Sequence, residues 1–265
     1  MKVVLFCGGL GTRLREYSDT LPKPLVPIGD RPIIWHLMKY YASFGHKDFI
    51  LCLGYKGLMI KEYFMDYCEW ASNDFTLDAS ARDVELFGTD LDDWRITFVD
   101  TGLQASIGQR LMAVRPYLEG EATFLANYSD GLSDLPLDRQ LAAFEESGAV
   151  ASFASVDPGY SFHIVDADPC GRVKRLVDCT TAGIRINGGF FVLSEEIFDH
   201  MQWGEELVVE PFSRLVDQGR LHAYRHDGFW GCMDTFKDKK RFDDLHDSGE
   251  RPWQVWNGCS GTHDR

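Results

Sequence analysis

The sequence predicts an α/β fold built on a mainly parallel sheet. From residue 1 to about residue 156, short apolar runs alternate with helical patterns, and strands that alternate with helices form crossover units with parallel strands. The chain has 265 residues, of which 45% are hydrophobic. That is enough for a full core in one large domain, although length alone would also allow two. Glycine-rich or acidic loops directly follow two of the apolar runs, and ligands of such sheets collect at the carboxyl ends of strands.

The elements of the first half are predicted from apolar runs and helix-end signals. Val3-Val4-Leu5-Phe6 predicts a buried first strand. Pro32 stands in the first turn of a helix predicted over 31–44, which Gly45 ends. Further strands are predicted over 49–53, 96–99 and 123–126, and further helices over 56–64 and 108–118. This order is that of crossover units.

Beyond residue 156 the strand-like pieces lie closer together, which predicts a mixed half of the sheet. The expected strands are 162–165, 172–177, 186–193 and 221–225, and the expected helices lie near 195–202, 207–218 and 236–247. Residues 66–95 are acidic and polar and break the earlier alternation. We interpret them as an insertion that forms a flap or an oligomer contact, with an ordinary surface excursion as the alternative. We expect one domain over 1–256 and a flexible tail over 257–265.

The composition excludes several classes of function. The net charge of −14 argues against general binding to nucleic acid or to anionic lipid. No stretch approaches the length of an apolar membrane span, and the N-terminus enters a strand without a signal-peptide pattern. The seven cysteines are scattered and form no C-x-x-C pair, which favours neither zinc nor a disulfide framework. We therefore expect a cytoplasmic protein with no nucleic-acid or membrane partner.

A glycine-rich loop after the first strand carries the strongest functional signal. It reads Cys7-Gly8-Gly9-Leu10-Gly11-Thr12-Arg13-Leu14 and is followed by Leu21-Pro22-Lys23-Pro24-Leu25. Glycines let backbone N–H groups approach phosphate oxygens closely, and Arg13 and Lys23 add positive charge. The loop lacks the last glycine of a dinucleotide fingerprint and the Lys-Ser or Lys-Thr of a P-loop. We interpret it as a nucleoside triphosphate site, with a purely structural tight turn as the alternative.

Two aspartates are candidates for holding a metal ion. Asp130 precedes a glycine in the segment Asn127-Tyr128-Ser129-Asp130-Gly131, which directly follows a buried strand. Asp234 follows the apolar stretch Phe229-Trp230-Gly231-Cys232-Met233. Mg²⁺ typically takes one or two protein carboxylates and completes its shell with phosphate and water oxygens. The alternatives are a turn-forming Asp-Gly at 130–131 and a helix N-cap at Asp234.

Two further loops carry candidate ligand contacts. Asn187-Gly188-Gly189 opens a strand, where a side-chain amide can hydrogen-bond a polyhydroxy ligand and the glycines let it approach. Gly102 and Gly108-Gln109-Arg110 lie at a loop-to-helix junction, where Arg110 can meet a phosphate. A solvated surface arginine is the alternative for Arg110.

Taken together, these segments resemble the sugar nucleotidyltransferase family, and within it the branch of cytidylyltransferases that act on glucose 1-phosphate. The shared phrases run through nearly the whole chain and include G-G-L-G-T-R-L, P-K-P-L-V-P-I-G, R-P-I-I-W-H-L-M-K, D-F-I-L-C-L-G-Y-K-G, I-N-G-G-F-F-V-L and M-D-T-F-K-D-K. The resemblance implies a Rossmann-like three-layer α/β/α fold with a mixed, mainly parallel sheet. It also implies dependence on Mg²⁺ and a homo-oligomer.

The resemblance implies roles for single residues as well. Arg13 and Lys23 would contact the triphosphate or the attacking phosphate, Asp130 and Asp234 would carry Mg²⁺, and these four are the candidate catalytic residues. The nucleotide would bind to the first strand and the loops beside it, at Leu5, Phe6, Cys7, Gly8, Gly9, Leu10, Gly11, Thr12, Arg13, Gly102, Arg110 and Ser129. The sugar phosphate would bind to Lys23, Arg185, Asn187, Gly188 and Trp230. The implied reaction transfers a cytidylyl group from CTP to a sugar 1-phosphate and releases pyrophosphate.

One departure from the family pattern concerns the acceptor. Relatives carry Glu-Lys-Pro shortly before the I-N-G-G segment, and its lysine meets the sugar phosphate, whereas residues 176–181 contain no lysine. Lys174, Arg175 and Arg185 are candidate substitutes. We favour Arg185, which precedes Asn187 by two residues and so faces the same side of a strand. The alternatives are another phosphorylated acceptor, dTTP or UTP in place of CTP, and a non-catalytic nucleotide-binding or sensing protein.

Overall fold

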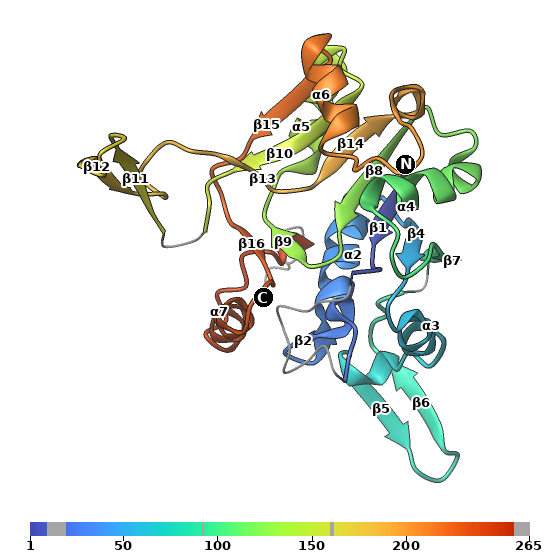
Figure 1. Ribbon diagram of the computed structural model, residues 1–265. Helices are drawn as coiled ribbons and strands as arrows, with labels where there is room; N and C mark the ends of the chain where they lie inside the picture. The colour runs from blue at the N-terminus through green and yellow to red at the C-terminus, as the bar shows by residue number, and fades with distance from the viewer. Residues whose placement is uncertain (10–19, 92, 160–161, 257–265) are drawn as a thin grey trace.

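A mixed eight-stranded sheet forms the centre of the protein (Figure 1). The computed structural model describes residues 1–9, 20–91, 93–159 and 162–256. The strand order is β13-β10-β14-β8-β1-β4-β7, and β15 pairs with β10. Strands β8, β1, β4 and β7 run parallel, whereas β14 is antiparallel to both of its neighbours, so the predicted mixed, mainly parallel sheet is confirmed. The strand bounds are β1 (Lys2–Phe6), β4 (Asp48–Leu53), β7 (Arg95–Asp100), β8 (Thr123–Tyr128), β10 (Ala151–Val156), β13 (Ile186–Asn187), β14 (Phe191–Ser194) and β15 (Leu221–Arg225).

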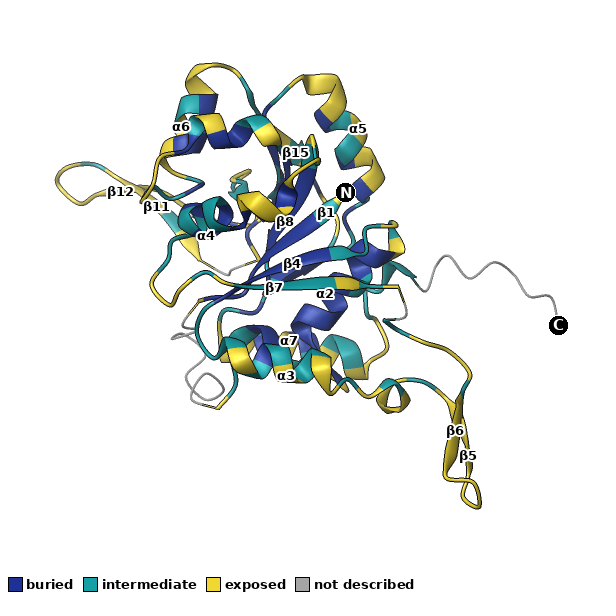
Figure 2. Ribbon diagram, turned by 90° about the vertical axis from the view of Figure 1, so that its right-hand side faces the viewer, coloured by how far each residue is buried: buried dark blue, intermediate teal, exposed yellow. Residues whose placement is uncertain are grey.

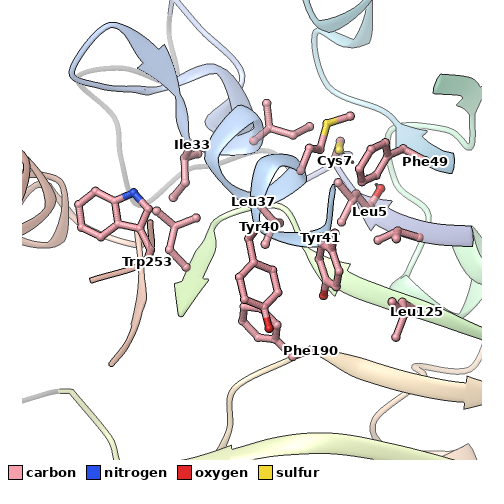
Figure 3. Packing of buried hydrophobic residues seen from close by; sticks show 14 of the residues in the cluster. Leu5, Cys7, Ile33, Leu37, Tyr40, Tyr41, Phe49, Leu125, Phe190 and Trp253 are labelled. Carbon is pink, nitrogen blue, oxygen red and sulfur yellow. Dashed lines mark hydrogen bonds between the residues drawn. The ribbon is translucent and has the colours of Figure 1, made fainter. Parts of the chain in front are cut away.

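Helices cover both faces of this sheet (Figure 2). In β1, Val3 and Leu5 pack into one apolar cluster and Val4 and Phe6 into another, because successive strand residues point to opposite faces. The first cluster, part of which is drawn in Figure 3, includes side chains of α2, α3, α5 and α7, and the second includes those of α4, α6 and η4. The three-layer α/β/α arrangement is therefore confirmed. The helix bounds are α2 (Ile33–Ser43), α3 (Gly57–Met65), α4 (Ile107–Val114), α5 (Leu137–Ser147), η4 (Glu195–His200), α6 (Glu210–Asp217) and α7 (Phe236–Asp247).

The strand predicted over 186–193 is wrong in one respect, because the structure divides it into β13 and β14. Gly189 and Phe190 between them have φ values of 76° and 50°, in the left-handed region that breaks a ladder. The buried Asn127 holds this break, since its Oδ1 accepts the Phe190 N–H at 2.9 Å. A Cβ on Gly189 would lie 2.4 Å from the same oxygen, so glycine is required where the backbone passes Asn127.

Three helical segments differ from the sequence prediction. The helix predicted over 108–118 ends at Val114 and continues as the 3-10 helix η3 (Arg115–Leu118), whose second residue is Pro116. A proline inside a helix removes a backbone donor and clashes with the preceding turn, whereas the first turn tolerates it. Helix α5 is not among the predicted helices, although Leu137, Leu141 and Phe144 recur at helical spacing. The segment predicted as a helix near 195–202 forms the 3-10 helix η4.

Two hairpins extend away from the central sheet (Figure 1). One is formed by β5 (Phe75–Asp78) and β6 (Asp83–Leu86), within the acidic segment 66–95, and lies at the lower end of the view. The other is formed by β11 (His163–Ala167) and β12 (Val173–Asp178). Three short pieces complete the structure around the site: η1 (Lys23–Leu25), β9 (Gly131–Ser133) and β16 (Trp230–Cys232).

The segment after α7 returns to the core. Trp253 is fully buried, and its ring lies 5.5 Å from that of Phe242 on α7. Trp256 packs against the same cluster and contacts the ring of Trp35 on α2. Among the described residues, no helix combines the length and the apolar character needed to cross a membrane. The predicted tail over 257–265 lies outside the described residues.

Candidate active site

A short antiparallel pairing brings the two candidate metal ligands together. Strands β9 and β16 pair with each other, so that Gly131 lies opposite Cys232. The Met233 N–H donates to the Asp130 carbonyl at 2.8 Å. Asp130 lies in the turn between β8 and β9, and Asp234 lies just beyond β16. The carboxylates therefore come from positions about a hundred residues apart in the chain but share one end of a two-stranded ladder.

Lys23 joins the two carboxylates. Its Nζ donates to Oδ2 of Asp130 at 2.5 Å and to Oδ1 of Asp234 at 2.6 Å. The three side chains are 15%, 23% and 26% exposed, so the cluster is shielded but reachable from solvent. Burial alone would lower the pKa of Lys23, but the charges and hydrogen bonds of Asp130 and Asp234 outweigh burial and raise that pKa. The lysine is therefore a permanent cation held between two anions.

Asp234 is not the N-cap of α7, so that alternative for Asp234 is wrong. The cap is Thr235, whose hydroxyl accepts the Asp238 N–H at 3.3 Å, while the Asp238 carboxylate accepts the Thr235 N–H at 2.8 Å. This reciprocal arrangement is a capping box. Because the neighbouring residue caps the helix, the Asp234 carboxylate can point toward Lys23.

The start of the glycine-rich loop lies beside Asp130. The Ser129 hydroxyl donates to the Phe6 carbonyl at 2.8 Å, which ties the end of β1 to the turn that carries Asp130. Leu5, Phe6 and Cys7 are buried, and burial raises the pKa of the Cys7 thiol to about 12. Gly8 and Gly9 follow at the carboxyl end of β1. Leu10, Gly11, Thr12 and Arg13 lie outside the described residues.

Arg110 lies beneath this loop and is 3% exposed, so the alternative of a solvated surface arginine is wrong. Its guanidinium donates to Thr101 Oγ1 at 2.6 Å and to the carbonyls of Gly8, Leu53 and Leu103 at 3.1, 3.2 and 3.4 Å. A Cβ added to Gly8 would lie 1.9 Å from Arg110 Nη1. Arg110 thus supports the loop from below, and its predicted contact with a phosphate stays a prediction. Gly102 lies in the adjoining loop with φ 93°.

The predicted sugar-side residues gather around the break between β13 and β14. The Trp230 indole N–H donates to the Gly188 carbonyl at 2.8 Å, which places β16 beside the Asn187-Gly188 segment. Asn187 Oδ1 accepts the Gly189 N–H at 2.9 Å. The Asn187 side-chain NH₂ is a donor as well, and its predicted contact with the sugar stays a prediction.

Arg185 is held by acidic partners. Its guanidinium donates to Asp227 Oδ1 at 2.7 Å and to Asp157 Oδ1 at 3.0 Å. Arg185 directly precedes β13, which begins at Ile186. Its Nε donates at 3.1 Å to Oγ of Ser155, the residue paired with Asn187, as expected if Arg185 and Asn187 face the same side. Lys174 and Arg175 are exposed on β12. A role for any of the three at the acceptor phosphate stays a prediction.

The Asp130–Asp234 pair fits a divalent cation. Two carboxylates that converge on one cation are the donor set that Mg²⁺ uses when phosphates and water supply its remaining ligands, and here the converging oxygens already contact the Lys23 ammonium. No cluster of three or more His, Cys, Asp or Glu side chains is arranged for a metal in the described part of the chain. Two carboxylates alone would leave the remaining ligand positions of such an ion to phosphate and water oxygens.

Sequence reasoning missed two features of this site. The bridge from Lys23 to both aspartates joins residues 107 and 211 positions apart, a separation that no local pattern reports. The role of Asn127 was also missed, although a side-chain amide at the end of an otherwise apolar strand was a visible signal. Asn127 also accepts the Tyr128 N–H and donates to the Tyr41 hydroxyl.

Comparison with known proteins gives the family. A family profile described as "Nucleotidyl transferase" matches residues 2–237. The "Probable glucose-1-phosphate cytidylyltransferase" of Bacillus subtilis (strain 168) is 40% identical over 97% of this chain and 100% of that protein. The "Glucose-1-phosphate cytidylyltransferase" of Salmonella typhi is 38% identical over 97% and 100%.

Solved structures share the fold. A UDP-glucose pyrophosphorylase complexed with UDP-glucose aligns with TM-score 0.67 and 16% identity over 94% of this chain and 98% of that chain. HddC from Yersinia pseudotuberculosis aligns with TM-score 0.65 and 20% identity over 92% and 99%. The predicted family is thereby confirmed: the chain belongs to the nucleotidyl transferase family and resembles its sugar nucleotidyltransferases over nearly its full length.

Proposed function

We propose that this protein transfers a cytidylyl group from CTP to glucose 1-phosphate in an Mg²⁺-dependent reaction, giving CDP-glucose and pyrophosphate. The observation that carries the proposal is the convergence of Lys23, Asp130 and Asp234 beside the end of β1, where the glycine-rich loop begins. The choice of CTP and glucose 1-phosphate is supported by the relatives at 40% and 38% identity, which are named for that activity.

The chemistry needs positioned charge more than a reactive side chain. An oxygen of the sugar phosphate attacks the α-phosphorus of CTP, and the bond from that phosphorus to the leaving pyrophosphate breaks. Asp130 and Asp234 would hold Mg²⁺, which neutralises charge on the phosphates when bound. Lys23 donates to phosphate oxygens, and positioning supplies much of the rate. No covalent enzyme intermediate is needed, and the buried thiol of Cys7, with its pKa raised to about 12, is unsuited to form one.

The proposed site for the sugar phosphate lies at the break between β13 and β14. Asn187, Gly188 and Trp230 form a connected set through the Trp230–Gly188 hydrogen bond, and we assign the sugar to this set. The lysine that relatives place before this segment is absent from residues 176–181. Another sugar phosphate as acceptor, or dTTP or UTP as donor, is therefore the second candidate.

We further propose that the protein works in the cytoplasm as a homo-oligomer and that residues 1–256 act as one domain. The projecting hairpin of β5 and β6 supports the interpretation of 66–95 as an insertion. Its side chains Phe75, Leu77 and Val84 are 41%, 58% and 41% exposed. This exposed apolar surface is compatible with an oligomer contact.

Pyrophosphate release across a panel of substrates tests the proposal. CTP, dTTP, UTP, GTP and ATP are each combined with glucose 1-phosphate, other sugar 1-phosphates and no acceptor, with and without Mg²⁺. The proposal expects release that needs CTP, glucose 1-phosphate and Mg²⁺ together. Release with another triphosphate or acceptor would assign the second candidate. Binding without release under any combination would indicate a nucleotide-binding or sensing protein.

A further inference from the structure

The Lys23 ammonium lies between the carboxylates of Asp130 and Asp234, where a metal ion would bind. One ammonium lies within hydrogen-bond distance of both carboxylates that the proposed function gives to Mg²⁺, at 2.5 Å and 2.6 Å. By contrast, the ion pair of Lys47 and Asp93 is largely exposed, since the two side chains are 41% and 61% accessible to solvent. Solvent therefore screens the attraction between them. Lys23 is 15% exposed, so its attraction to Asp130 and Asp234 is screened much less.

We propose that Lys23 takes the place of the divalent cation in the nucleotide-free protein and leaves both carboxylates when metal and nucleotide bind together. This inference rests on the proposed function, because it assumes that Asp130 and Asp234 are the metal ligands. A divalent ion uses carboxylate oxygens, and the ammonium already contacts one oxygen of each. A metal on the remaining oxygens would face a positive charge close by, and that repulsion is strong in a shielded site.

The local backbone allows Lys23 to leave by side-chain motion alone. Pro22 and Pro24 fix the backbone on either side, and the Leu25 N–H donates to the Pro22 carbonyl at 2.8 Å. Pro24 and Leu25 are buried, so the Cα of Lys23 is anchored. The long side chain can still change rotamer, and phosphate oxygens offer it new charge-assisted hydrogen bonds.

The exchange couples metal binding to nucleotide binding. A metal ion that arrives alone must displace Lys23 from two carboxylates and leaves the ammonium without an anion. A metal ion that arrives with a triphosphate brings the replacement partner for the ammonium. The nucleotide-free protein should therefore bind a divalent ion weakly, although both carboxylates are in place.

The test measures Mn²⁺ binding without nucleotide, from the electron paramagnetic resonance signal of the unbound ion. The proteins compared are wild type, Lys23→Met, Lys23→Arg, Asp130→Asn and the matched control Lys47→Met, which removes a lysine from the exposed Lys47–Asp93 pair. We expect Lys23→Met to bind Mn²⁺ more tightly than wild type by on the order of tenfold or more. Lys23→Arg keeps the competing charge and should bind like wild type, as should Lys47→Met.

The outcomes separate this inference from the proposed function. Equal or weaker binding by Lys23→Met, with binding still weakened in Asp130→Asn, overturns the exchange and leaves the metal assignment standing. No detectable Mn²⁺ binding by Lys23→Met overturns both. Tighter binding by Lys23→Arg as well would show that charge competition is not the cause and would also overturn the exchange.

Amine acetylation of the wild-type protein decides the question if Lys23→Met does not fold. Lys23 should react slowly with an acetylating reagent in the absence of metal. It should react faster at saturating Mg²⁺ when no pyrophosphate is present, and mass spectrometry measures both rates. Lys47 serves as the internal reference, whose rate should not change. A Lys23 rate that is independent of Mg²⁺ overturns the exchange.

Discussion

Lys23 and Arg110 are basic side chains near the same end of β1, but the structure surrounds them differently. Arg110 is 3% exposed and donates to three backbone carbonyls and a threonine hydroxyl. Lys23 is 15% exposed, and its ammonium contacts the carboxylates of Asp130 and Asp234. Backbone carbonyls are fixed by the fold, whereas paired carboxylates are costly to bring together unless a cation is needed there. The comparison indicates a structural role for Arg110 and a chemical role for Lys23.

The largest expected effect comes from removing Lys23. Lys23→Ala should lower kcat by roughly 10²–10³-fold, the usual scale for losing one donor that stabilises a transition state. Steady-state pyrophosphate release measures this, with Lys47→Ala as the control that should retain wild-type kcat. A change confined to KM would show that Lys23 only binds substrate and would weaken its contrast with Arg110.

Arg110→Met should act mainly on stability. The substitution removes four charge-assisted hydrogen bonds, two of them to the buried carbonyls of Gly8 and Leu53. We expect a loss of roughly 3 kcal/mol in the free energy of unfolding. Urea unfolding measures it, and the exposed Arg139 on α5 provides the control Arg139→Met, expected to be near wild type. Wild-type stability with a raised KM for CTP would instead make Arg110 a nucleotide contact.

Alanine substitutions at Gly8 and Gly9 test whether Arg110 constrains the glycine-rich loop. A Cβ on Gly8 would meet Arg110 Nη1 at 1.9 Å, whereas a Cβ on Gly9 has no heavy atom of the described residues within 4 Å. Gly8→Ala should cost about 1–3 kcal/mol of stability. Gly9→Ala should leave unfolding nearly unchanged and raise KM for CTP, because its Cβ enters the space given to the nucleotide. Equal stability of both variants would show that the Arg110 contact does not constrain the loop.

The smallest effect concerns the residue beside Asp234. Thr235→Ala removes the cap of α7 and should cost about 1 kcal/mol of stability while kcat stays close to wild type. Thermal unfolding and steady-state turnover measure the two quantities. A large loss of kcat without a loss of stability would mean that the capping box positions the Asp234 carboxylate. Thr235 would then have a chemical role in addition to its structural role as a helix cap.

The parallel half of the sheet could be predicted well because its signals are local. β1 and β4 contain apolar runs of four and five residues that are buried on both faces, and β8 contains a buried run of three. β7 at the sheet edge is only partly buried, but Ile96, Phe98 and Val99 still mark it as a strand. The break at Gly189 and Phe190 could not be predicted, since it depends on Asn127 in another strand. Helix α5 could have been predicted from the spacing of its apolar residues.

The candidate site was predictable in its residue types but not in its contacts. Each of the three residues had a local signal. Lys23 lies between two prolines, Asp130 follows the end of a predicted strand, and Asp234 follows an apolar stretch. Their direct contact depends on the pairing of β9 with β16, two strands of three residues each, too short to show a period. For Arg110 the sequence indicated a helix start but not the carbonyls that surround its guanidinium.

A double-mutant cycle on Asp130 and Asp234 tests the central claim, that these carboxylates form one metal unit with Lys23, most directly. Each Asp→Asn variant should lower kcat by on the order of 10²-fold or more. Asp93→Asn, from the exposed pair with Lys47, should retain wild-type kcat. The double variant should fall little below the worse single variant, because residues that act as a unit are strongly non-additive. Full additivity of the two losses would contradict the account by assigning the carboxylates separate tasks.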